Sequence, residues 1–136
     1  MNDNFKPGDK KTHHYVVKPE DVAQFDAGLV HPVCSTFTLA REMEWSSRLF
    51  VLEMKEDHEE GIGTEVSVKH HSPAMVGEEL LLTAEVASIQ EHELICQVTV
   101  KCQDRLIAKG ITGQKILSKE KIKKIFSSLE GDGRKG

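Results

Sequence analysis

The chain has 136 residues, a length that fits a single domain over residues 1–136 burying roughly two-thirds of its unfolded surface. Apolar residues make up 38% of the sequence and charged residues 29%, a composition that excludes a membrane-embedded protein and a natively unfolded one. The 18 basic and 22 acidic residues leave a net charge of -4, which disfavours binding to a nucleic-acid backbone.

The cysteines and the first residues of the chain bear on the cellular compartment. Cys34, Cys96 and Cys102 are odd in number and lack CxxC spacing, so the sequence predicts neither a disulfide framework nor a zinc site. Residues 1–11 are polar and contain no apolar stretch of the kind that a signal peptide needs. We therefore expect a cytoplasmic protein that binds neither nucleic acid nor membrane.

The N-terminal part of the chain predicts a short arm, one strand and one long helix. Residues 1–11 form the arm, which leads into a strand over residues 12–17. Over residues 37–54 the apolar side chains fall on one helical face. Ser35 and Thr36 stand just before this stretch and are candidates for its N-cap.

The second half of the chain predicts four further strands. The charged residues 56–60 and the glycine that follows them predict the end of the helix. The breaks between the later strands are short, which favours an antiparallel meander, since parallel strands need a longer crossover. A helix packed on the concave face of a curled sheet of about five strands makes an α+β fold. The four expected strands cover residues 66–68, 79–89, 94–100 and 106–117.

The lysine-rich residues 118–136 predict a C-terminal helix with a frayed end. Four apolar residues recur there at helical spacing: Ile122, Ile125, Phe126 and Leu129. A short helix docked on the body of the domain is the favoured interpretation, ahead of an arm for membrane or nucleic acid.

Glu44 is the first candidate for chemistry, because it lies at the edge of the apolar face of the long helix. A partly buried carboxylate can serve as a base or as a nucleophile. The alternative is a surface ion pair with Arg48 or Arg41, each about one helical turn away. The pattern alone does not separate these two interpretations.

His70 and His71 end the strand that follows the helix, and consecutive side chains of a strand point to opposite faces. At most one of them therefore faces the helix. Two adjacent histidines without a spaced acidic partner do not make a metal site, so no metal is expected. For Cys34, packing in the core is favoured over a role as nucleophile, because no neighbouring feature activates its thiol.

Three stretches together resemble the hot-dog-fold thioesterases related to fluoroacetyl-CoA thioesterase. PGDKKTHHYVVKPEDV is similar to the leading strand of that family, and STFTLAREMEW is similar to the start of its helix. GIGTEVSVKHHSPAMVGEEL, the most specific of the three, resembles its signature of Gly-Thr, alternating valines, a histidine and a small-residue turn. The resemblance extends over nearly the whole chain and implies a hot-dog fold.

The resemblance also implies the reaction and its residues. The catalytic positions of the family correspond here to Thr36, Glu44 and His70. They imply hydrolysis of an acyl-coenzyme A thioester, with Glu44 as nucleophile or general base, His70 polarising or positioning the reacting groups, and Thr36 orienting the carboxylate. Gly63 and Thr64 are implied to bind the substrate near the thioester carbonyl. Neither a metal nor a cofactor is implied beyond the coenzyme A of the substrate.

Helix geometry adds a separate expectation about assembly. Eight residues of helix separate Thr36 from Glu44 by about 12 Å along the axis, too far for a hydrogen bond in one straight helix. Either Thr36 precedes the helix and folds back, or the two residues meet across paired helices of two subunits. Hot-dog proteins generally dimerise by joining their sheets, so we expect a homodimer with two sites at its interface.

The sequence departs from the family in two places, of which the first concerns the substrate. Residues 21–33 are shorter than the lid of the fluoroacetyl-specific member and lack its prolines and aromatics, so another small or medium acyl group is expected. The last strand reads GITGQK where relatives carry Gly-Thr-His-Glu-Arg.

Two other functions remain open. One is a non-catalytic module that binds acyl-CoA or regulates. The other is an enoyl-CoA hydratase, for which Asp26 and His31 have the spacing but not the surrounding motif.

Overall fold

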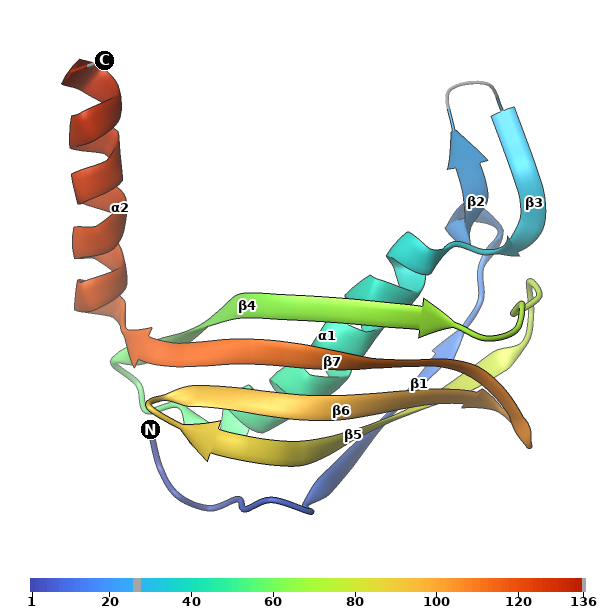
Figure 1. The fold of residues 1–136 in the computed structure, drawn as a ribbon, viewed down its shortest axis with the longest axis horizontal. Coiled ribbons are helices and arrows are strands. Elements are labelled where there is room, and N and C mark those ends of the chain that lie inside the picture. Colours follow the sequence, from blue (N-terminus) through green and yellow to red (C-terminus); the bar gives the residue numbers. More distant parts are fainter. Residues whose placement is uncertain (26–27, 136) are drawn as a thin grey trace.

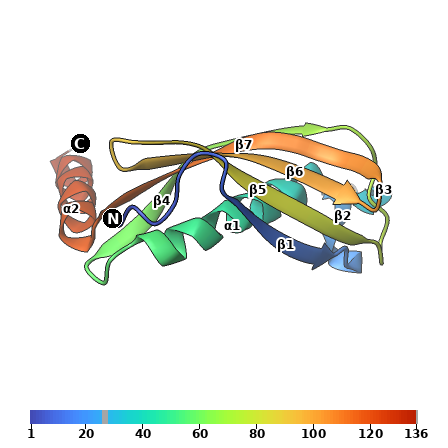
Figure 2. The same ribbon diagram turned by 90° about the horizontal axis from the view of Figure 1, so that it is seen from below.

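A computed structural model describes residues 1–25 and 28–135 of the chain. It contains a five-stranded antiparallel sheet in the order β1-β5-β6-β7-β4. The long helix α1 (Thr36–Met54) lies across one face of this curled sheet (Figures 1 and 2). The expected α+β architecture, one long helix against about five antiparallel strands, is confirmed. The five strands are β1 (Lys10–Val16), β4 (Glu59–His70), β5 (Glu79–Gln90), β6 (Glu93–Cys102) and β7 (Arg105–Ser118).

The core lies between α1 and the concave face of the sheet. The buried residues of α1 recur every three or four positions, whereas β6 alternates between buried and less buried residues. Each fully buried aliphatic or aromatic side chain contributes about 1.5–3 kcal/mol, so this interface holds the helix in place. Its largest fully buried members include Leu39, Met43, Phe50, Leu82 and Ile116.

Two features differ from the expectations: an additional hairpin before α1 and the first residue of β4. A separate two-stranded hairpin, β2 (Val22–Phe25) and β3 (Gly28–Cys34), occupies the segment for which no strand is expected. In addition, β4 begins at Glu59, where the charged residues predict only the end of a helix. Charged residues are compatible with a strand here because β4 lies at the edge of the sheet.

The C-terminal helix α2 (Lys119–Lys135) follows β7 directly and is longer than expected. It does not dock on the body of the domain, and that expectation is wrong for a single chain. Figure 1 shows it projecting from one end of the sheet, while the β2–β3 hairpin projects from the other end. Among the helices that the structure describes, none has both the length and the apolar character needed to cross a membrane.

Candidate functional site

An open groove of about 540 Å³ follows the seam between α1 and β4, within the size range typical of ligand sites. Its walls are largely apolar but include two carboxylates and two arginines. Its lining residues are Phe37, Ala40, Arg41, Glu42, Glu44, Trp45, Arg48 and Val66.

The start of α1 is held firmly at one end of this seam. Ser35 is the N-cap, since its hydroxyl accepts a hydrogen bond from the Thr38 amide at 3.0 Å. The Ser35 amide donates to the Asp21 carbonyl at 2.8 Å, and the Cys34 amide donates to the Ala74 carbonyl at 2.8 Å. These bonds fix the backbone on both sides of Thr36, the first residue of the helix.

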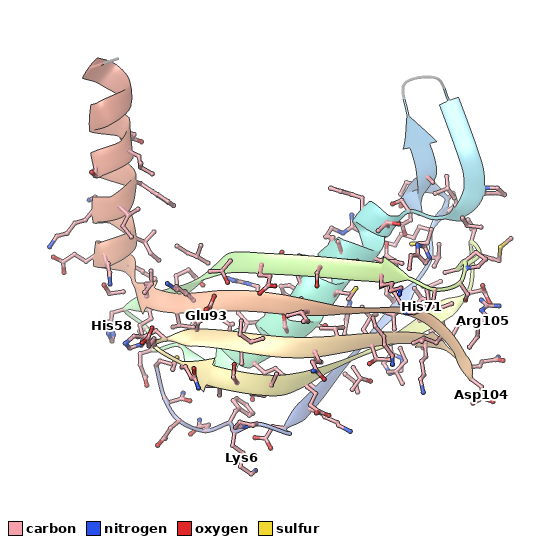
Figure 3. All side chains as sticks on the ribbon, viewed as in Figure 1. Lys6, His58, His71, Glu93, Asp104 and Arg105 are labelled. Atoms are coloured by element: carbon pink, nitrogen blue, oxygen red, sulfur yellow. The ribbon has the colours of Figure 1, made fainter. Side chains whose placement is uncertain are left out.

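Thr36 lies next to His70 at the end of β4. The Thr36 Oγ1 and the His70 Nδ1 are 3.1 Å apart, at hydrogen-bonding distance. The other ring nitrogen of His70, Nε2, is buried and has no hydrogen-bond partner among the described residues. His71 is exposed at the same end of the sheet (Figure 3), as the alternation of a strand requires. The structure therefore brings together two of the three expected catalytic residues.

Glu44 lies further along the seam, against Gly63 of β4. A Cβ on Gly63 would lie 3.0 Å from the Glu44 Oε1, so the absence of a side chain there lets the carboxylate approach the strand. The alternative of an ion pair with a neighbouring arginine is wrong, because Arg48 binds Glu60 at 2.9 Å and Arg41 binds Glu42 at 2.9 Å. Among the described residues, the Glu44 carboxylate therefore has no ion-pair partner.

Gln114 of β7 holds the helix at this point, a contact that sequence reasoning does not identify. Its buried amide nitrogen lies 3.3 Å from the Glu44 carbonyl and 3.1 Å from the Ser47 hydroxyl. The available signal is the departure of GITGQK from the pattern of the relatives, since Gln114 lies in that stretch. A buried amide that donates to the backbone of α1 fixes the height of Glu44 above the sheet.

Thr64, the second residue expected to bind substrate, lies apart from this group. A register shift between Gly63 and Glu65 sets it in a bulge of β4. Its hydroxyl is 2.6 Å from a carboxylate oxygen of Glu93, and a Cβ on Gly113 of β7 would lie 2.6 Å from the same hydroxyl. Glu93 is labelled in Figure 3. The structure therefore does not bring Thr64 together with Glu44.

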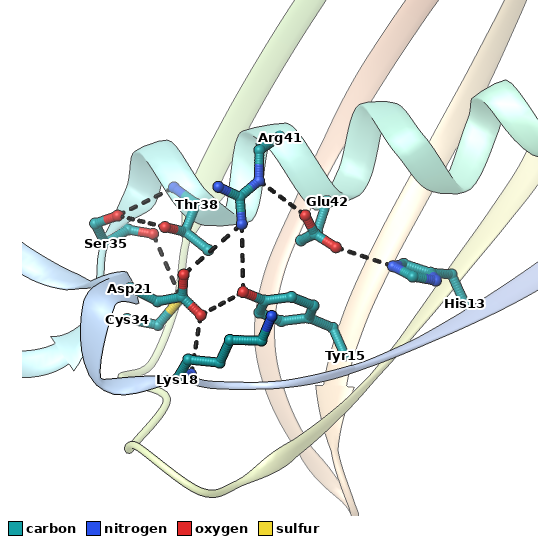
Figure 4. Close-up of polar contacts among 9 residues, drawn as sticks. All are labelled: His13, Tyr15, Lys18, Asp21, Cys34, Ser35, Thr38, Arg41 and Glu42. Atoms are coloured by element: carbon teal, nitrogen blue, oxygen red, sulfur yellow. Dashed lines mark hydrogen bonds and ion pairs between the residues drawn. The ribbon is translucent and has the colours of Figure 1, made fainter.

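A chain of polar contacts supports the start of α1 from the side of β1 (Figure 4). Tyr15 donates to the buried carboxylate of Asp21, and Arg41 donates to the Tyr15 hydroxyl at 3.3 Å. Glu42 joins the chain by accepting from Arg41 and by contacting His13 at 3.0 Å. Burial, together with the hydrogen bond to Asp21, raises the pKa of Tyr15, so the phenol remains a donor at neutral pH.

Cys34 has the packing role expected for it. Burial, and to a smaller extent the nearby negative charge of Asp21, raise the pKa of its thiol to about 11. The thiol is therefore protonated at neutral pH. Elsewhere in the described residues, no group of three or more His, Cys, Asp or Glu side chains is arranged to hold a metal ion. Asp26 and the His31 side chain, the pair considered for a hydratase, lie outside the described part of the structure.

Four of the expected site residues, three catalytic and one substrate-binding, form two separate pairs along one seam. Thr36 and His70 meet at the start of α1, and Glu44 meets Gly63 about two helical turns later. Since α1 is one continuous helix from Thr36 to Met54, the two pairs stay about 12 Å apart along its axis within one chain.

Comparisons with solved structures establish the fold. A hypothetical protein of Thermus thermophilus, described as a thioesterase superfamily member, is 29% identical with a TM-score of 0.90, over 96% of this chain and 97% of that one. The fluoroacetyl-CoA-specific thioesterase FlK, a mutant in complex with fluoroacetate and CoA, is 23% identical with a TM-score of 0.79, over 87% and 99%. A hot-dog-like protein from Thermanaerovibrio acidaminovorans is 15% identical with a TM-score of 0.84, over 92% and 93%.

A comparison of sequences establishes the family. No functionally curated protein matches the chain. The model of the family described as fluoroacetyl-CoA-specific thioesterase, however, matches residues 17–120, a stretch that contains all of α1 and the four strands that follow it. The resemblance found in the sequence is thereby confirmed: this hot-dog-fold chain belongs to the fluoroacetyl-CoA-specific thioesterase family.

Proposed function

We propose that this protein hydrolyses the thioester of a small or medium acyl-coenzyme A, with no cofactor beyond the coenzyme A of the substrate. One observation carries the proposal: Glu44, which forms no ion pair among the described residues, lines the groove between α1 and β4, and the Thr36–His70 pair lies at one end of the same seam. Membership of a thioesterase family supports the choice of a thioester as substrate.

The simplest route uses Glu44 as a general base. Its carboxylate removes a proton from a water molecule while the water oxygen attacks the thioester carbonyl carbon. The resulting tetrahedral intermediate breaks its carbon–sulfur bond, and the proton held by Glu44 passes to the departing sulfur. The products are a carboxylic acid and free coenzyme A, so atoms and charge balance.

The second route uses Glu44 as a nucleophile. Its oxygen attacks the carbonyl carbon and displaces the thiolate, which leaves a mixed anhydride that water then hydrolyses. In both routes Thr36 and His70 orient the reacting groups, and Gly63 leaves room for the carbonyl beside Glu44.

We further propose that two chains complete each site. In an antiparallel pair of α1 helices, a twofold axis beside Ala40 sets Thr36 of one protomer opposite Glu44 of the other, because Ala40 is midway between them. The midpoint of Gly63 and His70 on β4 falls at residues 66–67. Ala40 and Val66 line the same groove, so a single twofold axis can pass beside the midpoints of both α1 and β4.

The surfaces near this axis support the pairing. Phe37 and Trp45 of α1 are exposed by 78% and 42%, and Val66 is exposed by 40%. β4 is an edge strand of twelve residues, and an edge of that length favours pairing with another strand. A dimer joined at β4 therefore covers the apolar groove and pairs the open edge.

A panel of acyl-CoA thioesters tests the substrate class. We expect hydrolysis of at least one short, medium, branched or aryl acyl-CoA, with a kcat/KM at least tenfold above that for fluoroacetyl-CoA, because the segment before α1 differs from the fluoroacetyl-specific lid. Released thiol is the measurement. Fluoroacetyl-CoA as the best substrate would contradict the substrate class, and no turnover on any thioester would contradict the enzyme.

Replacing Gly63 by alanine tests the contact with the carboxylate. The added methyl group would lie 3.0 Å from the Glu44 Oε1, so the carboxylate must move, and we expect kcat to fall by about 10- to 100-fold. The midpoint of thermal unfolding should change little, because the displaced atom is the end of a flexible side chain. Glu65→Ala, an exposed neighbour on β4, serves as the control. Unchanged kcat in Gly63→Ala would exclude this position of Glu44 from the reaction.

A further inference from the structure

The C-terminal helix presents an apolar stripe to solvent. Ile125, Phe126 and Leu129 are exposed by 41%, 55% and 63%, and they fall on one face of α2 together with Ile122. Clustered apolar side chains of this kind are seldom left exposed without a partner. The apolar stripe is therefore expected to pack against another surface.

The position of α2 limits which surfaces its apolar stripe can contact. β7 ends at Ser118, which pairs with Glu59 at the start of β4, and α2 begins at the next residue. Figure 1 shows α2 extending beyond the β4 edge, in the direction in which the β2–β3 hairpin extends at the other end of the sheet. Figure 2 shows both elements nearly end-on, which agrees with this common direction. With 17 residues, α2 reaches about 25 Å past the sheet.

The proposed twofold axis places a second chain beyond the β4 edge, in the region into which α2 extends. When β4 strands pair antiparallel about residues 66–67, a residue near Glu60 lies opposite a residue near Pro73 of the partner. The root of α2 therefore comes beside the partner's turn between β4 and β5. The direction of α2 carries it along the base of the partner's β2–β3 hairpin.

The surface at that turn is suited to receive the stripe. Met75 and Val76 are exposed by 45% and 42% in the single chain. Met75 also bridges to Val33 of β3, so the turn and the hairpin form one surface. In the dimer, the apolar stripe of α2 of each protomer meets the Met75–Val76 turn of the other. Twofold symmetry makes this contact occur twice.

The distribution of charge also favours a second copy of this chain as the binding partner of α2. Residues 119–136 carry six basic and three acidic residues, whereas residues 1–118 carry 12 basic and 19 acidic residues. Glu20 and Glu79 are exposed near the base of the hairpin and the adjoining turn. A basic helix is thus attracted to the acidic body of a second copy.

We propose that α2 is an arm that docks on a second copy of this chain, with its apolar face against Met75 and Val76 beside the partner's hairpin. The inference rests on the dimer given under the proposed function. The Cys34–Ala74 backbone bond ties this turn to the start of α1, so the arm of one protomer buttresses the end of the seam that holds Thr36 and His70 of the other.

Sedimentation velocity over a range of concentrations tests the arm on the full chain. Phe126→Glu and Met75→Glu should each raise the dimer dissociation constant at least tenfold, because each sets a charge in the apolar contact. Ser127→Glu adds the same charge on the opposite face of α2 and should change the constant less than twofold. All three positions are exposed in one chain, so their melting temperatures should match the wild type, and thioester hydrolysis by the wild type is measured on the same preparation.

Each outcome decides the matter. An unchanged dissociation constant in Phe126→Glu, or an effect in Phe126→Glu but none in Met75→Glu, overturns the docking site. A wild type that is monomeric at every concentration also overturns it. Binding of wild type but not Phe126→Glu to phosphatidylserine vesicles, with an intact dimer, assigns α2 to a membrane surface instead. A dimer that responds as expected but hydrolyses no thioester supports the arm and rejects only the proposed function.

Discussion

Replacing Glu44 by glutamine is expected to lower the kcat for acyl-CoA hydrolysis by about three orders of magnitude, with acyl-CoA affinity within a few-fold of wild type. Glutamine keeps the size of the side chain but can neither remove a proton from water nor attack a carbonyl as a carboxylate does. Within the described part of the chain, Glu44 has no arginine partner whose loss would disturb the fold, since Arg41 and Arg48 bind other carboxylates. Thiol release and equilibrium binding of a non-hydrolysable analogue measure the two quantities.

Glu53→Gln is the matched control, since Glu53 is exposed near the other end of the same helix. Its kcat should equal that of the wild type. If Glu44→Gln retains full turnover, Glu44 is not the catalytic carboxylate. If the wild type binds acyl-CoA without any turnover, the chain is the non-catalytic binding module. An acyl adduct on the Glu44 peptide, trapped by acid quench of a single turnover, would select the nucleophilic route over the general-base route.

Mixing two inactive variants is expected to restore about a quarter of the wild-type activity. In a dimer with shared sites, a heterodimer of Glu44→Gln and His70→Ala has one intact site, with Thr36 and His70 from one chain and Glu44 from the other. Equal amounts of the two chains give about half heterodimer at random association, and one site in two is intact in it. The recovered kcat per chain is therefore about 25% of wild type.

Mixing Thr36→Ala with His70→Ala provides the control that the structure itself suggests. These two residues are 3.1 Å apart within one chain, so every site of that heterodimer lacks one of them and no activity should return. Chains with two different affinity tags allow the heterodimer to be isolated. Purified Glu44→Gln/His70→Ala heterodimer without recovered activity would show that each site lies within one chain.

Local sequence pattern predicts much of the fold because periodicity and capping act over a few residues. The apolar repeat of α1 and its Ser35 cap are found where the sequence indicates them. The β2–β3 hairpin escapes the pattern because it is short and contains Pro32, which weakens a strand assignment. The start of β4 escapes it because charged residues and glycines resemble a helix end as much as an edge strand.

The direction of α2 is a feature that local sequence pattern cannot predict. Its amphipathic pattern correctly predicts a helix, but the same pattern is satisfied by docking on its own body or on a second copy. Because β7 ends beside the start of the edge strand β4, at one end of the sheet, α2 leaves the domain instead of folding back. The pattern states that an apolar face needs a partner, and the geometry of the chain decides which surface is within reach.

From the sequence by itself came the family, the helix that carries Thr36 and Glu44, and the selection of His70 as a candidate site residue. Only the tertiary structure decided that Thr36 meets His70, that Glu44 lies against Gly63 and that Gln114 holds the helix above the sheet. The reason is physical. Hydrogen bonds and steric contacts act over about 3 Å, so they depend on strand register and on how a helix crosses a sheet. Residues 34 or 70 positions apart carry no record of that alignment in their local pattern.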